Sequence, residues 1–216
     1  FPLSITYGIS VFLRNTLFNV GIFSSKKYKT PIISVGNLCF GGTGKSPLVE
    51  YILRLIDSHN KVAVLSRGYG RNSKGFQWVK NTSLVKDVGD EPLQIAKKFP
   101  KVNVAVSESR NNGIKEILLK ECDLILLDDA YQHRWVKPGL NILLTTYDDL
   151  FVNDFLLPYG KLRESKKNFN RADIIVVTKT PYPLLPLDEY RLKEQISPFF
   201  NQKLCYSYLE YQKPVS

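Results

Sequence analysis

The sequence predicts an α/β fold in which a mainly parallel sheet lies between two layers of helices. Short runs of Val, Ile and Leu recur along the 216 residues and are typical of strands that are buried on both faces. Segments with helical spacing lie between several of these runs, the order found where a parallel sheet is built. A glycine-rich segment follows the first run directly, and a mostly apolar segment precedes it. We therefore expect a three-layer α/β/α core preceded by an N-terminal amphipathic helix.

The N-terminal segment, residues 1–28, is mostly apolar, and Arg14 is its only charge before Lys26. Its polar residues make it a poor bilayer span, and it shows no small-residue cleavage site of a secretory signal. Two interpretations stay open. The helix could lie in a membrane interface with Lys26, Lys27 and Lys29 near anionic headgroups, or it could pack on the core.

Residues 36–46 read GNLCFGGTGKS and follow the apolar run at 31–35. A glycine-rich turn between a strand and a helix that ends in Gly-Lys-Ser predicts a phosphate-binding loop. Lys45 would reach the β- and γ-phosphates, and Ser46 would ligate Mg²⁺. The nucleotide-binding set is Gly41, Gly42, Thr43, Gly44, Lys45 and Ser46. Cys39 stands where the general pattern has its first glycine, so a chance glycine-rich turn is the alternative.

The remaining elements are expected from the same periodicities. Helices are expected at 45–58, 92–98 and 111–120, strands at 62–65, 102–106, 124–127, 142–145 and 174–178, and a short hairpin at 76–79. Proline-rich residues 181–186 indicate a linker or domain edge. We expect three parts: a membrane-associating helix at 1–28, a P-loop core at 29–181, and at 182–216 a linker and the start of a truncated further domain.

Two adjacent carboxylates end the apolar run at 124–127. An Asp at the tip of a strand beside the phosphate loop can hold Mg²⁺ or its water, and either Asp128 or Asp129 could be that ligand. Paired carboxylates repel each other, so the other carboxylate could act at the reacting centre instead. Solvated acids at a strand end are the alternative interpretation.

A further Asp stands just before a predicted helix, in the sequence VGDEP at 88–92. Phosphoryl transfer to an alcohol needs a carboxylate to receive the hydroxyl proton, and Asp90 is the candidate, although it could also be a helix cap. Arg67 follows the second strand and could contact phosphate. His133, just past the acidic pair, is a candidate for a substrate role. Pro181 replaces the Asp of the guanine-reading Asn-Lys-x-Asp pattern, which favours ATP over GTP.

The net charge of +10 and the three cysteines narrow the function classes. Cysteines without a CxxC pair exclude a zinc site and favour a reducing compartment. The charge suits an anionic membrane surface, a phosphorylated substrate or nucleic acid. We expect no nucleic-acid partner, because no basic groove studded with aromatic residues is visible.

Five motifs occur in an order that resembles the tetraacyldisaccharide 4′-kinase family, the lipid A 4′-kinases. They are the loop at 35–47, SRGYG at 66–70, VGDEP at 88–92, DDAYQH at 128–133 and LPYGKLRE at 157–164. The resemblance implies phosphorylation, with ATP and Mg²⁺, of the 4′-hydroxyl of a membrane-embedded acylated disaccharide 1-phosphate. The implied location is peripheral, on the cytoplasmic face of the bacterial inner membrane with its anionic surface, without an obligate protein partner.

By matching motif, the resemblance implies that Lys45, Asp90 and Asp129 are catalytic, with Asp90 as the base. Ser46 and Asp128 would hold the metal. Arg163 and Glu164 would lie near the substrate, and with Arg67 and His133, the two candidates named above, they make up the expected substrate-binding set. Ala130 stands where the family usually has Gly, so the turn after Asp129 is expected to differ.

Alternative functions also fit parts of the pattern. One is a P-loop GTPase or metallochaperone-like switch ATPase, and GTP binding much tighter than ATP binding would favour the GTPase. A nucleic-acid-dependent ATPase and a membrane adaptor with a degenerate loop are the other candidates, and the adaptor would not bind Mg-ATP.

Overall fold

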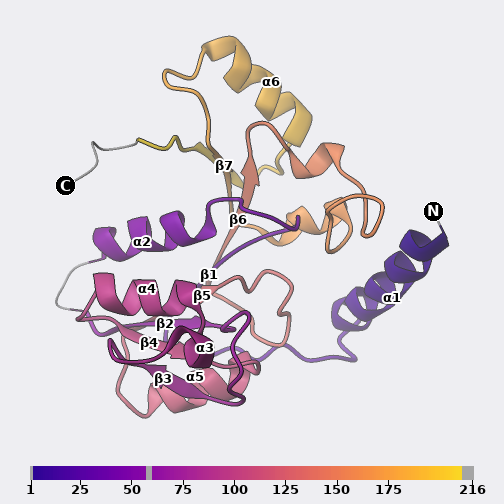
Figure 1. Ribbon diagram of the computed structural model, residues 1–216. Helices are drawn as coiled ribbons and strands as arrows, with labels where there is room; N and C mark the ends of the chain where they lie inside the picture. Colours follow the sequence, from indigo (N-terminus) through magenta and orange to yellow (C-terminus); the bar gives the residue numbers. More distant parts are fainter. Residues whose placement is uncertain (1, 57–59, 211–216) are drawn as a thin grey trace.

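The computed structural model describes residues 2–56 and 60–210, and its elements alternate between strands and helices (Figure 1). The helices are α1 (Pro2–Asn19), α2 (Lys45–Leu55), α3 (Val85–Val88), α4 (Asp90–Lys98), α5 (Arg110–Leu118), α6 (Pro186–Ile196) and the short 3-10 helices η1 (Phe151–Asn153) and η2 (Lys166–Arg171). The strands are β1 (Ile32–Asn37), β2 (Val62–Ser66), β3 (Gln77–Val79), β4 (Asn103–Val106), β5 (Leu124–Asp128), β6 (Leu140–Thr146), β7 (Ile174–Thr178) and β8 (Lys203–Tyr206).

The strands form one sheet in the order β3-β4-β2-β5-β1-β6-β7-β8. Every pair is parallel except β3 with β4, which is antiparallel. Strand β1 lies between β5 and β6, so strands β2 to β5 are on one side of β1 and strands β6 to β8 are on the other. In open α/β sheets such a switch point at the carboxyl ends of the strands is where ligands bind. The glycine-rich loop leaves β1 at that point.

Both faces of the sheet are buried, which explains the short all-apolar runs. On one face Val62 and Val64 of β2 pack with the apolar residues of α2 and α4. On the other face Ala63 and Leu65 pack with α5, and farther along the sheet Leu143 and Ile175 belong to a cluster that includes α6. The mainly parallel α/β fold predicted from the sequence is confirmed.

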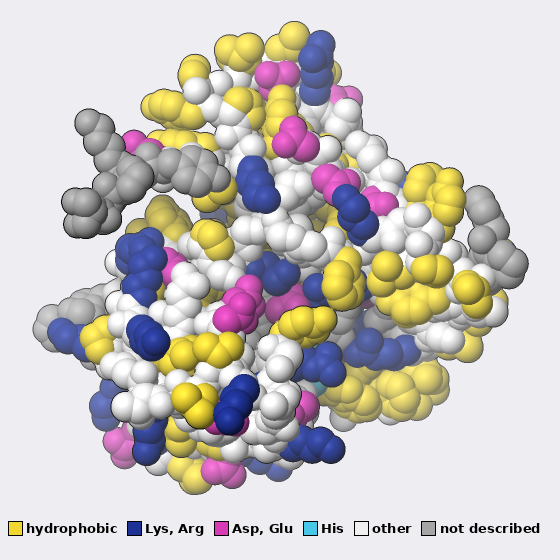
Figure 2. Space-filling view, viewed as in Figure 1, with side chains coloured by type: hydrophobic (Ala, Val, Ile, Leu, Met, Phe, Trp, Pro, Cys, Tyr) yellow, Lys and Arg dark blue, Asp and Glu magenta, His cyan; other side chains and the backbone are white. Residues whose placement is uncertain are grey.

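Helix α1 lies beside the sheet domain, away from the other helices (Figure 1). Its outward face is apolar, and yellow side chains gather over that part of the surface in Figure 2. The exposed residues of this face are Leu3, Ile5, Ile9, Phe12 and Leu13, with exposed fractions from 53% to 71%. Within the described residues, no helix combines the length and hydropathy that crossing a bilayer requires.

Some sequence expectations differ from the structure. The predicted hairpin at 76–79 is wrong: this segment holds the single strand β3, which pairs with β4 across the sheet edge. Helix α2 ends at Leu55, and residues 57–58 of the predicted helix lie outside the described residues. Helix α6 and strand β8 were not expected, and β8 extends the sheet beside β7. The division of the chain at 181/182 stays a prediction, with residues 211–216 outside the described part.

Candidate active site

The loop between β1 and α2 takes its shape from two glycines. Gly41 and Gly44 have φ angles of 118° and 81°, which L-residues with a side chain rarely adopt. Gly44 directly precedes the first residue of α2. The backbone therefore enters the helix with free amide groups at its positive end, an arrangement that favours a phosphate.

Cys39, which occupies the place of the usual first glycine, has no positive φ angle. It is buried and forms an antiparallel bridge with Leu162. On either side, the amide of Phe40 donates to Lys161 and the amide of Arg163 donates to Leu38, at 2.7 and 2.8 Å. The first half of the loop thus runs as a short extended strand against the LPYGKLRE motif, where a glycine is not needed.

Two side chains fix the second half of the loop. The side-chain amide of Asn37 donates to the hydroxyl of Thr43 at 2.8 Å. The hydroxyl of Thr178, at the end of β7, donates to the backbone carbonyl of Thr43 at 2.9 Å. All three residues are buried. The loop is therefore held by side chains in the ends of two strands, β1 and β7.

Asp128 and Asp129 lie in different environments. Asp128 is 1% exposed at the end of β5, and its Oδ1 has no hydrogen-bond partner. Burial raises the pKa of Asp128 to about 6, and the negative charges of Glu91 and Asp129 contribute to the rise. An unpaired buried carboxylate oxygen is a suitable ligand for a hard cation.

The side chain of Asp129 is paired with two cations. Lys45 Nζ lies 3.7 Å from its Oδ1, and Arg163 donates to both carboxylate oxygens at 3.1 and 3.0 Å. Asp129 itself has a φ of 46°, whereas Ala130 does not have a positive φ. The left-handed residue of this turn is therefore the Asp, and Ala130 needs no glycine-like freedom. The turn approaches β1 so closely that a Cβ on Gly36 would lie 2.7 Å from the Cβ of Tyr131.

The first turn of α4 meets the first turn of α2. Ser46 Oγ donates to Glu91 Oε1 at 2.8 Å. Asp90 is exposed, and its carboxylate accepts from the amide of Glu91 at 2.9 Å. The residue that precedes the helix is Gly89, so Asp90 is the first residue of α4 and not its cap.

Arg110 contacts the backbone next to the acidic pair Asp128–Asp129. Its side chain is buried and donates to the carbonyls of Ser107 and Asp128, at 2.8 and 3.2 Å. Burial lowers the pKa of Arg110 to about 10, and the charges of Asp128 and Asp129 oppose that change. A guanidinium that remains charged at neutral pH therefore holds the backbone at the end of β5.

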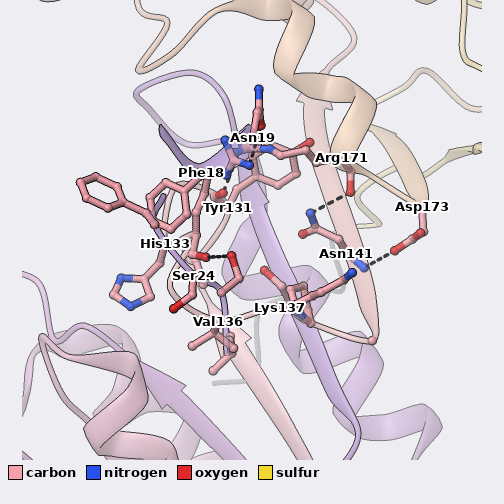
Figure 3. A pocket seen from close by; sticks show the side chains of 18 of the residues that line it. Phe18, Asn19, Ser24, Tyr131, His133, Val136, Lys137, Asn141, Arg171 and Asp173 are labelled. Atoms are coloured by element: carbon pink, nitrogen blue, oxygen red, sulfur yellow. Dashed lines mark hydrogen bonds between the residues drawn. The ribbon is translucent and has the colours of Figure 1, made fainter. Parts of the chain in front are cut away.

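Two of the predicted substrate residues differ in exposure: His133 is half-buried, whereas Arg67 is exposed. His133 lines a cavity of about 790 Å³ together with Tyr131, Asn141 and Arg171 (Figure 3). Burial lowers the pKa of His133 to about 4, and the positive charges of nearby arginines, Arg67 among them, lower it further. The imidazole is therefore neutral at physiological pH. Arg67 is exposed just past the end of β2.

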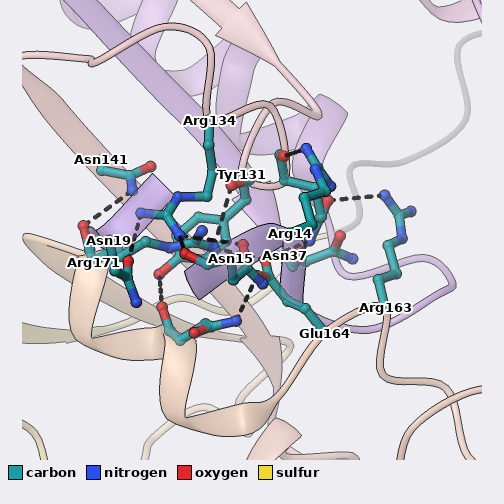
Figure 4. A network of polar contacts seen from close by, with 12 residues as sticks. Arg14, Asn15, Asn19, Asn37, Tyr131, Arg134, Asn141, Arg163, Glu164 and Arg171 are labelled. Carbon is teal, nitrogen blue, oxygen red and sulfur yellow. Dashed lines mark hydrogen bonds and ion pairs between the residues drawn. The ribbon is translucent and has the colours of Figure 1, made fainter. Parts of the chain in front are cut away.

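Glu164 is the centre of a buried network that joins α1 to the site (Figure 4). Its oxygens accept from Asn15 of α1 at 3.1 Å and from Arg171 at 2.6 Å. Asn168 and Gln132 donate to the same carboxylate at 2.7 and 3.4 Å. With four side chains as partners and an exposed fraction of 2%, this carboxylate faces the protein and not the solvent.

The oxygen ligands needed for Mg²⁺ are present near the loop. In nucleotide sites this ion takes one or two protein side chains and completes its shell with phosphate and water. The unpaired Asp128 oxygen and the Ser46 hydroxyl fit that requirement. Among the described residues no group of three or more His, Cys, Asp or Glu side chains could hold a metal ion alone. The donor set thus fits a metal that arrives with a nucleotide.

The structure brings together most of the predicted catalytic and metal residues and adds four others. Sequence reasoning missed Asn37, Glu91, Arg110 and Thr178 as parts of the site. Glu91 lies inside the VGDEP motif, where the pattern indicated only an acidic first turn. Asn37 lies inside the loop motif, six residues before its partner Thr43, but the pattern gave its side chain no role. Thr178 bonds the same Thr43 from 135 residues away, a contact that no local pattern indicates.

The family described as tetraacyldisaccharide-1-P 4′-kinase (LpxK) matches residues 1–204, nearly the whole chain and every segment that forms this site. The chain belongs to this family. It is 46% identical to the tetraacyldisaccharide 4′-kinase of Flavobacterium psychrophilum, covering 100% of this chain and 64% of the relative. It is 48% identical to the tetraacyldisaccharide 4′-kinase of Bacteroides fragilis strain YCH46, covering 98% of this chain and 57% of the relative.

A solved structure of an LpxK supports the same assignment. LpxK from Aquifex aeolicus in complex with ATP matches with a TM-score of 0.79 and 38% identity, covering 94% of this chain and 62% of that one. The present chain therefore spans less than two thirds of the length of these relatives.

Proposed function

We propose that the protein is a lipid kinase that transfers the γ-phosphate of ATP to the 4′-hydroxyl of tetraacyldisaccharide 1-phosphate in lipid A biosynthesis. The observation that carries the proposal is the meeting of Lys45, Asp129 and the Ser46–Glu91 pair at the carboxyl edge of the sheet, in a chain of the LpxK family.

Two observations support ATP as the phosphate donor. The LpxK of Aquifex aeolicus was solved in complex with ATP. In this chain the Thr178 hydroxyl is engaged by the phosphate loop, and Pro181 stands where a guanine-reading Asp would be. A switch GTPase is therefore the less suitable function for this site.

The roles follow from the positions of the side chains. The free backbone amides of the loop at 41–46 and the ammonium of Lys45 bind the phosphates. Ser46 and Asp128 would hold Mg²⁺, and Glu91 orients the Ser46 hydroxyl through their hydrogen bond. When bound, the ion would neutralise charge on the β- and γ-phosphates.

Proton transfer is assigned to the exposed carboxylate at the start of α4. Asp90 receives the proton of the 4′-hydroxyl as the sugar oxygen forms its bond to the γ-phosphorus. The bond from that phosphorus to the bridging oxygen breaks, and ADP leaves with the electron pair. Asp129 keeps Lys45 and Arg163 side by side, so that two cations face the transferred phosphoryl group.

The surface of α1 supports a membrane-embedded substrate. An apolar groove of about 540 Å³ runs between this helix and the segment 154–166. Ile5, Ile9 and Phe12 line one side, and Phe155 and Leu156 line the other. Together with the lysines that follow the helix, this face suits peripheral attachment to the anionic cytoplasmic face of the inner membrane.

The proposal is tested with Lys45→Ala and Asp90→Ala in the full-length protein, with Asp87→Ala as a control for a nearby carboxylate. Asp90→Ala should lower kcat on the order of 10²- to 10⁴-fold while ATP still binds, because only the proton acceptor is lost. Lys45→Ala should weaken ATP binding as well as transfer. Phosphate transfer from ATP to the lipid that stays near wild type in both variants would show that the roles are wrong.

A further inference from the structure

Helices α2 and α4 lie next to each other on one face of the sheet, and each begins at the active site (Figure 1). Their apolar residues, such as Val49 and Leu53 of α2 and Leu93 and Ala96 of α4, belong to one core cluster. Apolar contacts of this kind are not directional and define the axial register of two helices poorly. The relative position of the two helix starts therefore depends on polar contacts between them.

A row of side chains supplies those contacts. Ser46 and Glu50 lie on one stripe of α2, and Glu91, Gln94 and Lys98 lie on the facing stripe of α4. Ser46 donates to Glu91 at the site. Farther from the site, Glu50 accepts hydrogen bonds from Gln94 and Lys98. Among the described residues, only Ser46 and Glu50 of α2 form side-chain hydrogen bonds with α4.

Glu50 is the main connection in this row. Its side chain is 8% exposed. Gln94 donates to one carboxylate oxygen at 3.1 Å, while Lys98 and Arg54 donate to the other. A buried carboxylate is tolerated only with such partners, and removing them is strongly unfavourable, so the pairing favours one register of the two helices.

We propose that Glu50 is a positioning residue for phosphoryl transfer. By fixing α4 against α2, it places Glu91 beside Ser46 and sets the position of Asp90 next to the nucleotide. Glu50 itself touches neither nucleotide nor substrate. The inference rests on the proposed function for its chemical step, whereas its effect on Mg²⁺-dependent nucleotide binding can be measured independently.

The test uses the full-length protein with Glu50→Ala and Glu50→Gln. Leu53→Ala is the matched control, because it removes core contacts of the same helix without touching the polar row. The first readout is the factor by which Mg²⁺ tightens the binding of a fluorescent ATP analogue. The second readout is the change in kcat and the change in KM for lipid phosphorylation, each measured at several concentrations of free Mg²⁺.

Glu50→Ala should reduce the Mg²⁺ factor on the order of 10-fold, since outer partners of a metal site typically contribute that much. Glu50→Gln should lose less, because an amide still accepts one hydrogen bond and donates another. Leu53→Ala should lower the thermal midpoint while leaving the Mg²⁺ factor as in the wild type. In a Glu91→Ala background, Glu50→Ala should add little further effect.

An unchanged Mg²⁺ factor and unchanged kinetics in Glu50→Ala, with a lower thermal midpoint only, would overturn the inference. If Glu50→Ala does not fold, Gln94→Leu and Lys98→Met approach the same contacts from α4 and must reproduce the loss. A wild-type protein that fails to phosphorylate the lipid would overturn the proposed function, and the binding readout would still decide the role of Glu50.

Discussion

Asp128 and Asp129 are adjacent residues with different chemistry, because the chain turns between them. Asp128 belongs to β5 and points an unpaired oxygen into the protein, whereas Asp129 adopts a left-handed conformation. That change of direction brings its carboxylate to Lys45 and Arg163. One dipeptide thereby supplies the proposed metal ligand, Asp128, and the ion-pair partner of Lys45 and Arg163, Asp129.

His133 gives a prediction about pH. Its pKa is about 4 in the folded protein, against 6.5 for an unperturbed imidazole. Between these values the unfolded chain binds more protons, so the stability that neutral His133 contributes is complete above pH 6.5 and is lost as the pH falls towards 4. The full effect should be on the order of 2 kcal/mol, less than the shift alone would give, because part of the ring is exposed.

The measurement is chemical denaturation of the wild type and of His133→Gln between pH 4 and pH 8. The stability difference between the two proteins should shrink steadily from pH 6.5 to pH 4. A difference that stays constant over this range would contradict the burial of a neutral imidazole.

Among the single residues of the candidate site, the sequence predicts those that belong to a local motif. Lys45, Ser46 and the acidic pair follow from Gly-Lys-Ser and from a strand that ends in two carboxylates. Glu91 does not, since its partner Ser46 is 45 residues away and nothing in the local pattern distinguishes it from any acid in a first helical turn. The burial of Glu164 was also not predictable, because its partners come from three separate segments.

Among the elements, α1 shows an arrangement that periodicity alone left undecided. Its inner side is tied down by polar contacts, such as those of Arg14 with the Gln132 carbonyl at 2.7 Å and of Asn15 with Glu164. Phe18 is buried on the same inner side, whereas Leu3, Ile5, Ile9, Phe12 and Leu13 face outward. The helix is thus attached to the core, as one of the two interpretations expects. Contact of its outer face with a lipid surface stays a prediction.

This arrangement predicts weaker membrane binding when charge is placed on the outer face. Ile9→Asp and Phe12→Asp should each reduce binding to vesicles of anionic phospholipid by about tenfold or more, the loss expected when one large apolar side chain no longer enters the interface. Leu119→Asp is the control, since Leu119 is 79% exposed but lies at the end of α5. Equal vesicle binding by all three variants and the wild type would exclude α1 as the contact.

The central strands of the sheet were easier to predict than the strand β8 at its edge. β5 and β7 are buried on both faces and therefore read as continuous apolar runs. β8 alternates between exposed and half-buried residues, from Lys203 to Tyr206, and such a short, partly exposed run is not distinctive. It becomes a strand through pairing with β7, which is a tertiary effect.

In the whole molecule, the apolar face of α1 and the phosphate loop are parts of one unit. Glu164 links α1 to Gln132, and Gln132 donates to the carbonyl of Asn37 at the end of β1 at 2.6 Å. The proposed lipid contact and the proposed nucleotide site are therefore mechanically connected. This connection suits an enzyme whose donor is soluble and whose acceptor lies in a membrane.

The most direct test of the central claim is to analyse the lipid product. The full-length protein is incubated with Mg-ATP and tetraacyldisaccharide 1-phosphate, and the product is examined by mass spectrometry with assignment of the phosphate position. We predict a disaccharide that carries one additional phosphate on the 4′-oxygen, formed by the wild type and lost in Asp90→Ala. ATP hydrolysis without a phosphorylated lipid, or transfer that requires GTP, would contradict the account.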